Sequence, residues 1–163
     1  MTTSRRRKIV AVIGASEPST QEAKNALEVG RLLGAAGLTV VSGGLGGVME
    51  AVSRGVAEAG GTVIGIVQDP EPDSCNPYVE ISIATGMDDG RNVVIANTAD
   101  VFIAIGGSLG TLSEIAYALK RRKPVIGLGT WELDASRLRG EPWLRAETPE
   151  EAVRIAVQRL NDA

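Results

Sequence analysis

The chain has 163 residues, of which 44% are hydrophobic and 23% are charged, a composition typical of a single globular domain, residues 1–163. Its 17 basic and 20 acidic residues leave a formal charge of -3, which argues against electrostatic binding of nucleic acid. Histidine is absent, so Ser-His-Asp and Cys-His catalysis and His-ligated metal sites are excluded, and we expect no bound metal. The single Cys75 cannot form an internal disulfide, as expected of a cytoplasmic protein.

The first half of the chain predicts a βαβαβ unit. Residues 9–13 form a short apolar run that follows the basic residues 5–8 and so imitates a secretory leader. The length of the run and the residues after it, Gly14 and Glu17-Pro18, instead favour a buried strand at 8–13. The elements predicted next are a helix at 19–36 that ends at Gly37, a strand at 39–41, a helix at 48–59 and a strand at 62–67.

The second half continues the same alternation. After a proline-rich loop at 68–77, residues 79–83 predict a short edge strand. The elements predicted next are a helix at 88–97, a strand at 100–105, a helix at 111–120 and a strand at 124–128. Thr148 is a typical N-cap for the last helix, with Pro149 at its first position and acidic residues in its first turn.

This pattern predicts an α/β fold: a Rossmann-like doubly wound, mostly parallel sheet with helices on both faces. In such a sheet, the loops that follow the strands meet at one edge and bind ligands where the strand order reverses. The loops at 14–16, 42–47, 85–91 and 106–111 should therefore form one site. No apolar run approaches the roughly 20 residues of a membrane span, so no membrane is expected as a partner.

The loop at 106–111 predicts a phosphate site. Thr111 would open a helix whose free N–H groups and dipole favour an anion, and Gly110 would leave room for its close approach. The alternative is a tight turn in which Thr111 and Glu114 form an ordinary capping box. Four glycines between residues 42 and 47 strengthen the phosphate interpretation. The candidate binding residues are Gly14, Ser16, Gly43, Gly44, Gly46, Gly47, Met49, Gly107, Ser108, Gly110 and Thr111.

Two familiar nucleotide-binding motifs are absent from these loops. No Gly-Lys-Ser/Thr is present, so the chain has no P-loop, and residues 14–18 do not match the GxGxxG of a dinucleotide site. The second predicted strand also ends without a carboxylate for a ribose hydroxyl. An ATPase or a dehydrogenase is therefore not supported.

Residues 42–49 (SGGLGGVM) resemble the GGGxxGLM motif of the Lonely Guy (LOG) superfamily, and residues 106–114 (GGSLGTLSE) resemble its PGGxGTxxE motif. Two long motifs in the right order make a specific match that spans nearly the whole chain. Within the superfamily, the chain is most similar to the short branch that contains molybdenum cofactor carrier proteins, through residues 84–92 and 112–116. Members are often labelled lysine decarboxylases, but no lysine lies in a candidate loop, so we do not expect that activity.

The resemblance implies roles for two charged residues. LOG enzymes hydrolyse the N-glycosidic bond of nucleoside 5′-monophosphates without a cofactor, giving the base and ribose 5-phosphate. Their phosphate lies on the PGGxGT turn, and their essential Arg and Glu match Arg91 and Glu114, the candidate catalytic residues. A carboxylate beside the sugar would stabilise an oxocarbenium-like state, and Arg91 would orient the phosphate or polarise the leaving base.

The chain departs from the enzyme motifs at several positions. Gly106 replaces the motif's Pro, Ser108 replaces its second Gly, and the MHxRK segment appears as DDGRN at 88–92, without its His and Lys. These departures favour binding of a phosphorylated nucleotide or a pterin-type cofactor such as the molybdenum cofactor. A phosphoribohydrolase is the alternative, because Arg91 and Glu114 are retained.

The segment around Arg91 also has a simpler interpretation. Arg91 would be a surface residue in the first turn of a helix, with Asp88 as its cap and Asp89 as a first-turn acid.

The resemblance further implies a homodimer or larger homo-oligomer that pairs through helices such as 88–97. The apolar Val93, Val94 and Ile95 would make interface or core contacts. The other expected partner is a phosphorylated small molecule; neither nucleic acid nor a membrane is expected.

Overall fold

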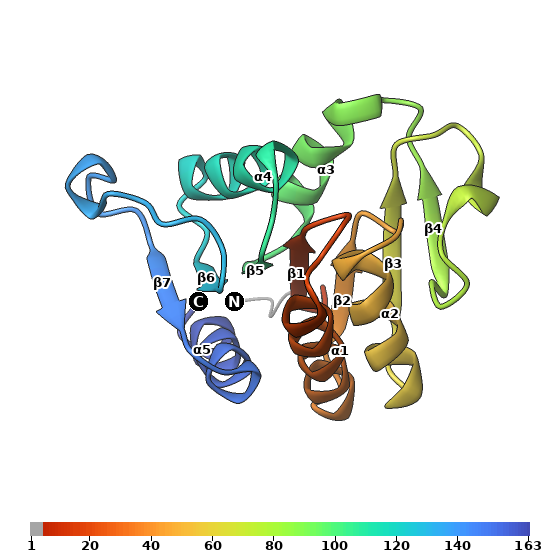
Figure 1. The fold of residues 1–163 in the computed structure, drawn as a ribbon, viewed down its shortest axis with the longest axis horizontal. Coiled ribbons are helices and arrows are strands. Elements are labelled where there is room, and N and C mark those ends of the chain that lie inside the picture. The colour runs from red at the N-terminus through yellow and green to blue at the C-terminus, as the bar shows by residue number, and fades with distance from the viewer. Residues whose placement is uncertain (1–4) are drawn as a thin grey trace.

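The structure, a computed structural model, describes residues 5–163. Its strands are β1 (Ile9–Gly14), β2 (Thr39–Ser42), β3 (Val63–Val67), β4 (Ile81–Ala84), β5 (Val101–Ile105), β6 (Val125–Leu128) and β7 (Trp143–Ala146). They form one sheet in the order β4-β3-β2-β1-β5-β6-β7, and every neighbouring pair is parallel (Figure 1). The predicted doubly wound α/β fold is therefore confirmed. The strand order reverses at β1, which lies between β2 and β5.

Helices cover both faces of this sheet. They are α1 (Thr20–Ala35), α2 (Val48–Glu58), α3 (Arg91–Thr98), α4 (Leu109–Lys120) and α5 (Pro149–Asn161). Helices α1, α2 and α5 pack on one face, and α3 and α4 pack on the other (Figure 1). Along β1, Val10 and Val12 point into the first core and Ala11 and Ile13 into the second, as the two-residue period of a strand requires. None of the helices within residues 5–163 is long and apolar enough to cross a membrane.

Local sequence explains where the helices begin and end. Helix α1 starts with a full capping box, in which the Ser19 hydroxyl accepts from the Glu22 N–H and the Glu22 carboxylate accepts from the Ser19 N–H. It ends at Ala35, and Gly37, just after the C-cap residue Ala36, has a φ of 71°. Thr148 caps α5 as predicted and accepts from the Glu151 N–H.

Strand β7 was not predicted. It lies at one edge of the sheet, its first three residues are only partly buried or exposed, and it therefore lacks the apolar run of the central strands. The connection from β6 contains only a 3-10 turn (Ala135–Arg137) and no α-helix, so the β-α alternation used for prediction breaks down there.

The predicted helix at 88–97 is divided in two. Residues Asp88–Gly90 form a 3-10 turn, and α3 starts at Arg91 with Gly90 at its N-cap position and no side-chain cap. The prediction of Asp88 as the cap is therefore wrong, because its φ of 47° turns the chain away from the helix. Within α3, Ile95 lies in the core, whereas Val93 and Val94 are only partly buried.

Candidate functional site

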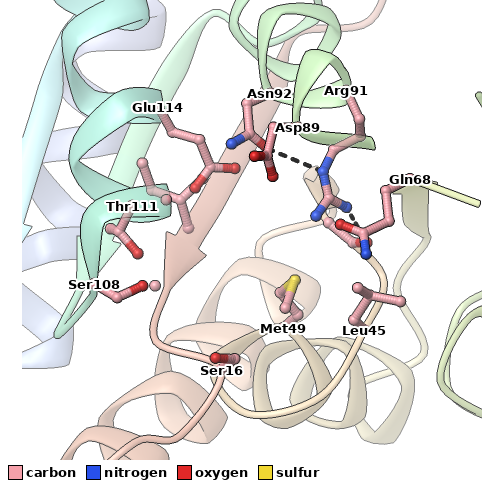
Figure 2. A pocket seen from close by; sticks show the side chains of 14 residues that line it. Ser16, Leu45, Met49, Gln68, Asp89, Arg91, Asn92, Ser108, Thr111 and Glu114 are labelled. Carbon is pink, nitrogen blue, oxygen red and sulfur yellow. Dashed lines mark hydrogen bonds between the residues drawn. The ribbon is translucent and has the colours of Figure 1, made fainter. Parts of the chain in front are cut away.

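A cavity of about 290 Å³ lies at the carboxyl edge of the sheet, where the strand order reverses (Figure 2). Gly14 ends β1, Gly43 follows β2, Gln68 follows β3 and Ser108 follows β5, so the parallel strands deliver all four residues to one place. The lining is Ile13, Gly14, Ser16, Gly43, Leu45, Met49, Gln68, Asp89, Arg91, Asn92, Ser108, Gly110, Thr111 and Glu114.

The N-terminus of α4 forms one wall of this cavity. The helix starts at Leu109, and Ser108 stands at the N-cap position without a side-chain cap bond, so the first N–H groups of α4 have no partner from a cap. Gly107 precedes them with a φ of 122°, and a Cβ there would lie 2.6 Å from the Thr111 side chain. The turn therefore requires glycine, and the helix presents free donors at the cavity.

The interpretation of Thr111 and Glu114 as a capping box is wrong. Because α4 begins two residues before Thr111, Thr111 lies inside its first turn and Glu114 one turn further on. Neither side chain makes a hydrogen bond to any part of the chain that the structure describes. Thr111 is only 2% exposed and Glu114 only 8%, and both line the cavity.

Within residues 5–163, Ser74 Oγ is the one fully buried side-chain oxygen or nitrogen without a hydrogen-bond partner. The Thr111 hydroxyl and the Glu114 carboxyl therefore open onto the cavity, where water can reach them. A polar molecule in the cavity would satisfy the Thr111 hydroxyl and the Glu114 carboxyl together. The wall formed by α4 therefore has the character of a binding site rather than of a helix cap.

The protonation of Glu114 is shifted by its surroundings. Burial raises the pKa of its carboxyl to about 7, and the positive charge of Arg91 opposes that shift. Near neutral pH the group is therefore divided between a neutral form, which can donate a hydrogen bond, and a charged form, which only accepts. A carboxyl of this kind is suited both to contact a phosphate or hydroxyl and to transfer a proton.

Arg91 is buried, not a surface residue; its exposed fraction is 7%, which overturns the simpler interpretation. Its Nη1 donates to the carbonyl oxygen of Gly43 at 2.6 Å, and its Nε donates to Asn92 Oδ1 at 3.0 Å (Figure 2). Nη1 also donates to the carbonyl oxygen of Ile66 at 2.7 Å. The side chain thus joins the loop after β2 to β3 and α3. Burial lowers the pKa of the guanidinium, and the charges of Glu114, Asp89 and Asp69 oppose that effect.

Most of the sequence-predicted site residues meet at the cavity. Arg91 and Glu114 line it together with Gly14, Ser16, Gly43, Met49, Ser108, Gly110 and Thr111. Gly43 lies against Arg91, and a Cβ on Gly43 would be 2.7 Å from Arg91 Nη1. A larger residue at position 43 would therefore displace the guanidinium from the Gly43 carbonyl oxygen that it binds. The binding and catalytic roles of these residues stay predictions, since geometry alone shows only that they converge.

Four predicted binding residues do not line the cavity: Gly44, Gly46, Gly47 and Gly107. Gly47 is the N-cap residue of α2 with a φ of 67°, and a Cβ there would lie 2.4 Å from the Ala15 and Ser16 carbonyl oxygens. Gly44 packs against β3, where its Cβ would lie 3.1 Å from Gly65 Cα. These two glycines are therefore explained by close packing of the backbone.

Sequence reasoning missed five residues that line the cavity: Ile13, Leu45, Gln68, Asp89 and Asn92. Gln68 is the first residue after β3, so the rule that parallel strands end at one edge could have identified it. Asp89 and Asn92 flank Arg91 and could have been found with it. Residues 5–163 contain no cluster of three or more Cys, Asp or Glu side chains that could hold a metal ion.

Comparisons with known proteins agree with this architecture. The molybdenum cofactor binding protein of the phototrophic bacterium Rippkaea orientalis has a TM-score of 0.88 and 34% identity, over 96% of this chain and 99% of that protein. The Moco carrier protein of Chlamydomonas reinhardtii has a TM-score of 0.87 and 32% identity, over 97% of this chain and 100% of that protein.

A curated enzyme is also similar in sequence. The cytokinin riboside 5′-monophosphate phosphoribohydrolase LOG of Oryza sativa subsp. japonica is 35% identical over 119 residues. The match covers 69% of this chain but only 48% of the rice protein. The family model for the SLOG cluster4 family matches residues 7–153, and the chain therefore belongs to the SLOG cluster4 family.

Proposed function

We propose that this protein binds a phosphorylated nucleotide or a phosphorylated pterin-type cofactor in the cavity at the carboxyl edge of the sheet. The ligand's phosphate would lie at the N-terminus of α4, against the hydroxyls of Ser16, Ser108 and Thr111. Its ring would extend toward Leu45 and Met49, which supply an apolar surface on the other side of the cavity (Figure 2).

The observation that carries this proposal is that Thr111 and Glu114, both largely buried, turn polar atoms without a partner in the described chain into the cavity, beside the free N–H groups of a twelve-residue helix. A helix N-terminus alone attracts anions weakly, but a hydroxyl and a carboxyl that open onto the same cavity can also hydrogen-bond a polar ligand there in place of water. The cavity of about 290 Å³ is small for a dinucleotide and suits a mononucleotide-sized molecule.

Two features support binding without turnover. The Moco carrier proteins match this chain over nearly their whole length, whereas the rice hydrolase is matched over 48% of its own. In addition, Arg91 uses its Nε and Nη1 on protein oxygens, so it serves largely to hold the walls of the cavity together. Among the relatives' ligands, the molybdenum cofactor is therefore our expected type of cargo.

A nucleoside 5′-monophosphate phosphoribohydrolase is the second candidate function. It is favoured by Glu114, whose pKa of about 7 would let it hold a charge beside a ribose near neutral pH, and by the positive charge of Arg91 close to it. In that reaction, water would replace the base at the anomeric carbon, giving the free base and ribose 5-phosphate.

We expect Gly110→Val to abolish the thermal stabilisation that phosphate and nucleoside monophosphates give to this protein. A Cβ at Gly110 meets no protein atom within 4 Å, and Gly110 lines the cavity, so the valine would occupy ligand space without disturbing the fold. Because ligand binding to the native state raises the melting temperature by mass action, differential scanning fluorimetry measures the effect.

Gly46→Val is the matched control. A Cβ at Gly46 also meets nothing within 4 Å, but Gly46 does not line the cavity. An equal ligand-induced rise in melting temperature in Gly110→Val and in the parent would contradict the placement of the phosphate.

Turnover is tested separately. Nucleoside monophosphates incubated with the parent protein and analysed by chromatography should be recovered intact; release of free base would instead establish the hydrolase.

We also expect this protein to form a homodimer or larger homo-oligomer. Helix α4 and the segment after β6 form a groove lined in part by Leu112, Ile115, Leu133 and Leu138. Leu109, the first residue of α4, is 74% exposed. Apolar surface of this kind is typical of a protein interface. Light scattering at micromolar concentration should give at least twice the chain mass of 17.0 kDa, and the mass of one chain would contradict the expectation.

A further inference from the structure

The three residues that follow β6, Gly129, Thr130 and Trp131, form a clamp on the turn that leads into α4. The Gly106 N–H, directly after β5, donates to the Gly129 carbonyl oxygen at 3.1 Å. The Thr130 hydroxyl in turn donates to the Gly106 carbonyl oxygen. The indole Nε1 of Trp131 donates to the Ser108 carbonyl oxygen at 3.1 Å. Three hydrogen bonds therefore join the clamp to the turn that carries the proposed phosphate site.

Gly106 stands where the PGGxGTxxE motif has proline. Its φ of 58° is closed to proline, whose ring fixes φ at about −65°. Proline also has no N–H, so it could not donate to the Gly129 carbonyl oxygen. Glycine at this position therefore permits a contact between the turn and the clamp that the motif's own residue could not make.

The Trp131 contact fixes the first peptide of α4. The Ser108 carbonyl oxygen accepts from the indole and also from the Leu112 N–H at 3.0 Å, so both of its lone pairs have donors. The peptide between Ser108 and Leu109 is trans, so the Leu109 N–H points opposite to this carbonyl, toward the N-terminal end of the helix. That is the end at which the helix dipole favours an anion.

Core packing does not account for the position of the indole. Trp131 is 37% exposed, and neither hydrophobic core of residues 5–163 includes it. The contact that the structure gives its one polar atom is the Ser108 carbonyl oxygen. Thr130 is likewise only partly buried. Substitutions at these two positions should therefore leave both cores intact.

We propose that Thr130 and Trp131 are positioning residues for phosphate binding, which hold the turn in the shape that presents the first N–H groups of α4 to the anion. This inference rests on the proposed function, since it names residues that prepare the same phosphate site. Neither side chain lines the cavity, so both act through the backbone of Gly106 and Ser108. Donors that are fixed before binding need no ordering when the ligand arrives, so loss of the clamp should weaken binding.

Titration calorimetry with inorganic phosphate and with AMP tests this inference. Thr130→Val removes the hydroxyl with little change of shape, and Trp131→Phe removes the indole N–H but keeps an aromatic ring. Each variant should bind both probes about fivefold more weakly, which corresponds to the loss of one hydrogen bond. Thr130→Ser keeps the hydroxyl and should restore the affinity of the parent.

Trp143→Phe is the matched control, because it makes the same substitution at the other of the chain's two tryptophans, which packs against a core and not against the turn. It should bind both probes as the parent does. Melting temperatures of the ligand-free proteins are measured beside the affinities. A residue that only stabilises the fold would change the melting temperature, but not the dissociation constant measured well below it, where nearly all of the protein is folded.

The outcomes separate this inference from the proposed function. Unchanged affinities in Thr130→Val and Trp131→Phe would overturn the inference while the phosphate site stands, and so would equal losses in Thr130→Val and Thr130→Ser. An equal loss in Trp143→Phe would show a general effect on the fold and would also overturn it. A parent protein that binds neither phosphate nor AMP would overturn the proposed function and this inference with it.

Discussion

Glu114→Gln should stabilise the ligand-free protein by about 3 kcal/mol at pH 8 and by only about 1 kcal/mol or less at pH 5. The folded-state pKa of Glu114 is about 7, above its ordinary value of 4.5, because burial disfavours the charged form. Between pH 4.5 and about pH 7, Glu114 binds a proton more often in the native protein than in the unfolded chain. The free energy of unfolding therefore falls as the pH rises through this range. Glutamine is neutral throughout and avoids that loss.

Denaturant unfolding of both proteins from pH 5 to pH 8 measures this difference. Glu17→Gln removes an exposed carboxylate and controls for the change in net charge. Stability curves of the parent and Glu114→Gln that run parallel across this range would show that Glu114 titrates normally, and the cavity wall at α4 would then be more hydrated than its burial indicates. Ligand should be absent from both proteins, since a phosphate beside Glu114 would change its pKa.

The same variant separates the two candidate functions. If the protein is a hydrolase in which Glu114 stabilises the oxocarbenium-like state, Glu114→Gln should lower turnover at least about tenfold, equivalent to roughly 1.4 kcal/mol in the barrier. If the protein only binds its ligand, glutamine can still donate and accept hydrogen bonds, and affinity should change little at a pH where the carboxyl is protonated.

Arg91→Met should lower the free energy of unfolding by about 3 kcal/mol or more. Methionine keeps much of the aliphatic volume, but it removes the donors that satisfy the carbonyl oxygens of Gly43 and Ile66 and the amide oxygen of Asn92. Hydrogen bonds to a charged donor are among the stronger ones in proteins, and here they join segments 25 and 48 residues apart. Arg91→Lys should recover little of this loss, because an ammonium lacks the planar fork of the guanidinium.

Denaturant midpoints of the parent and the variants measure this effect. Arg54→Met is the control, because Arg54 pairs with Glu58 on the exposed surface of α2, and its removal should shift the midpoint far less. An Arg91→Met protein that unfolds like the parent but no longer binds ligand would show that Arg91 contacts the ligand rather than holding the cavity walls together.

Local sequence was sufficient for the parts of this protein that depend on near neighbours. The buried strands β1 and β5 are uninterrupted apolar runs, and the caps of α1 and α5 are satisfied within one turn, so their positions follow from residues close together in the chain. The parallel arrangement then followed from the alternation of strands with helices. It also placed the loops after β1, β2, β3 and β5 at one edge of the sheet, where the cavity lies.

Contacts between distant segments decided the rest. Arg91 is buried because its guanidinium donates to the carbonyl oxygens of Gly43 and Ile66. These partners are distant in the sequence, and no local pattern around residue 91 reveals them. The start of α4 at Leu109 places Thr111 and Glu114 at the cavity rather than in a cap, although their spacing fits a capping box equally well. Asp89 reaches the cavity only through the 3-10 turn before α3. Periodicity and capping are local properties, whereas the burial of a side chain and its hydrogen-bond partners are set by the packed fold. Only the tertiary structure could therefore distinguish the candidate ligand contacts from the side chains that hold the site together.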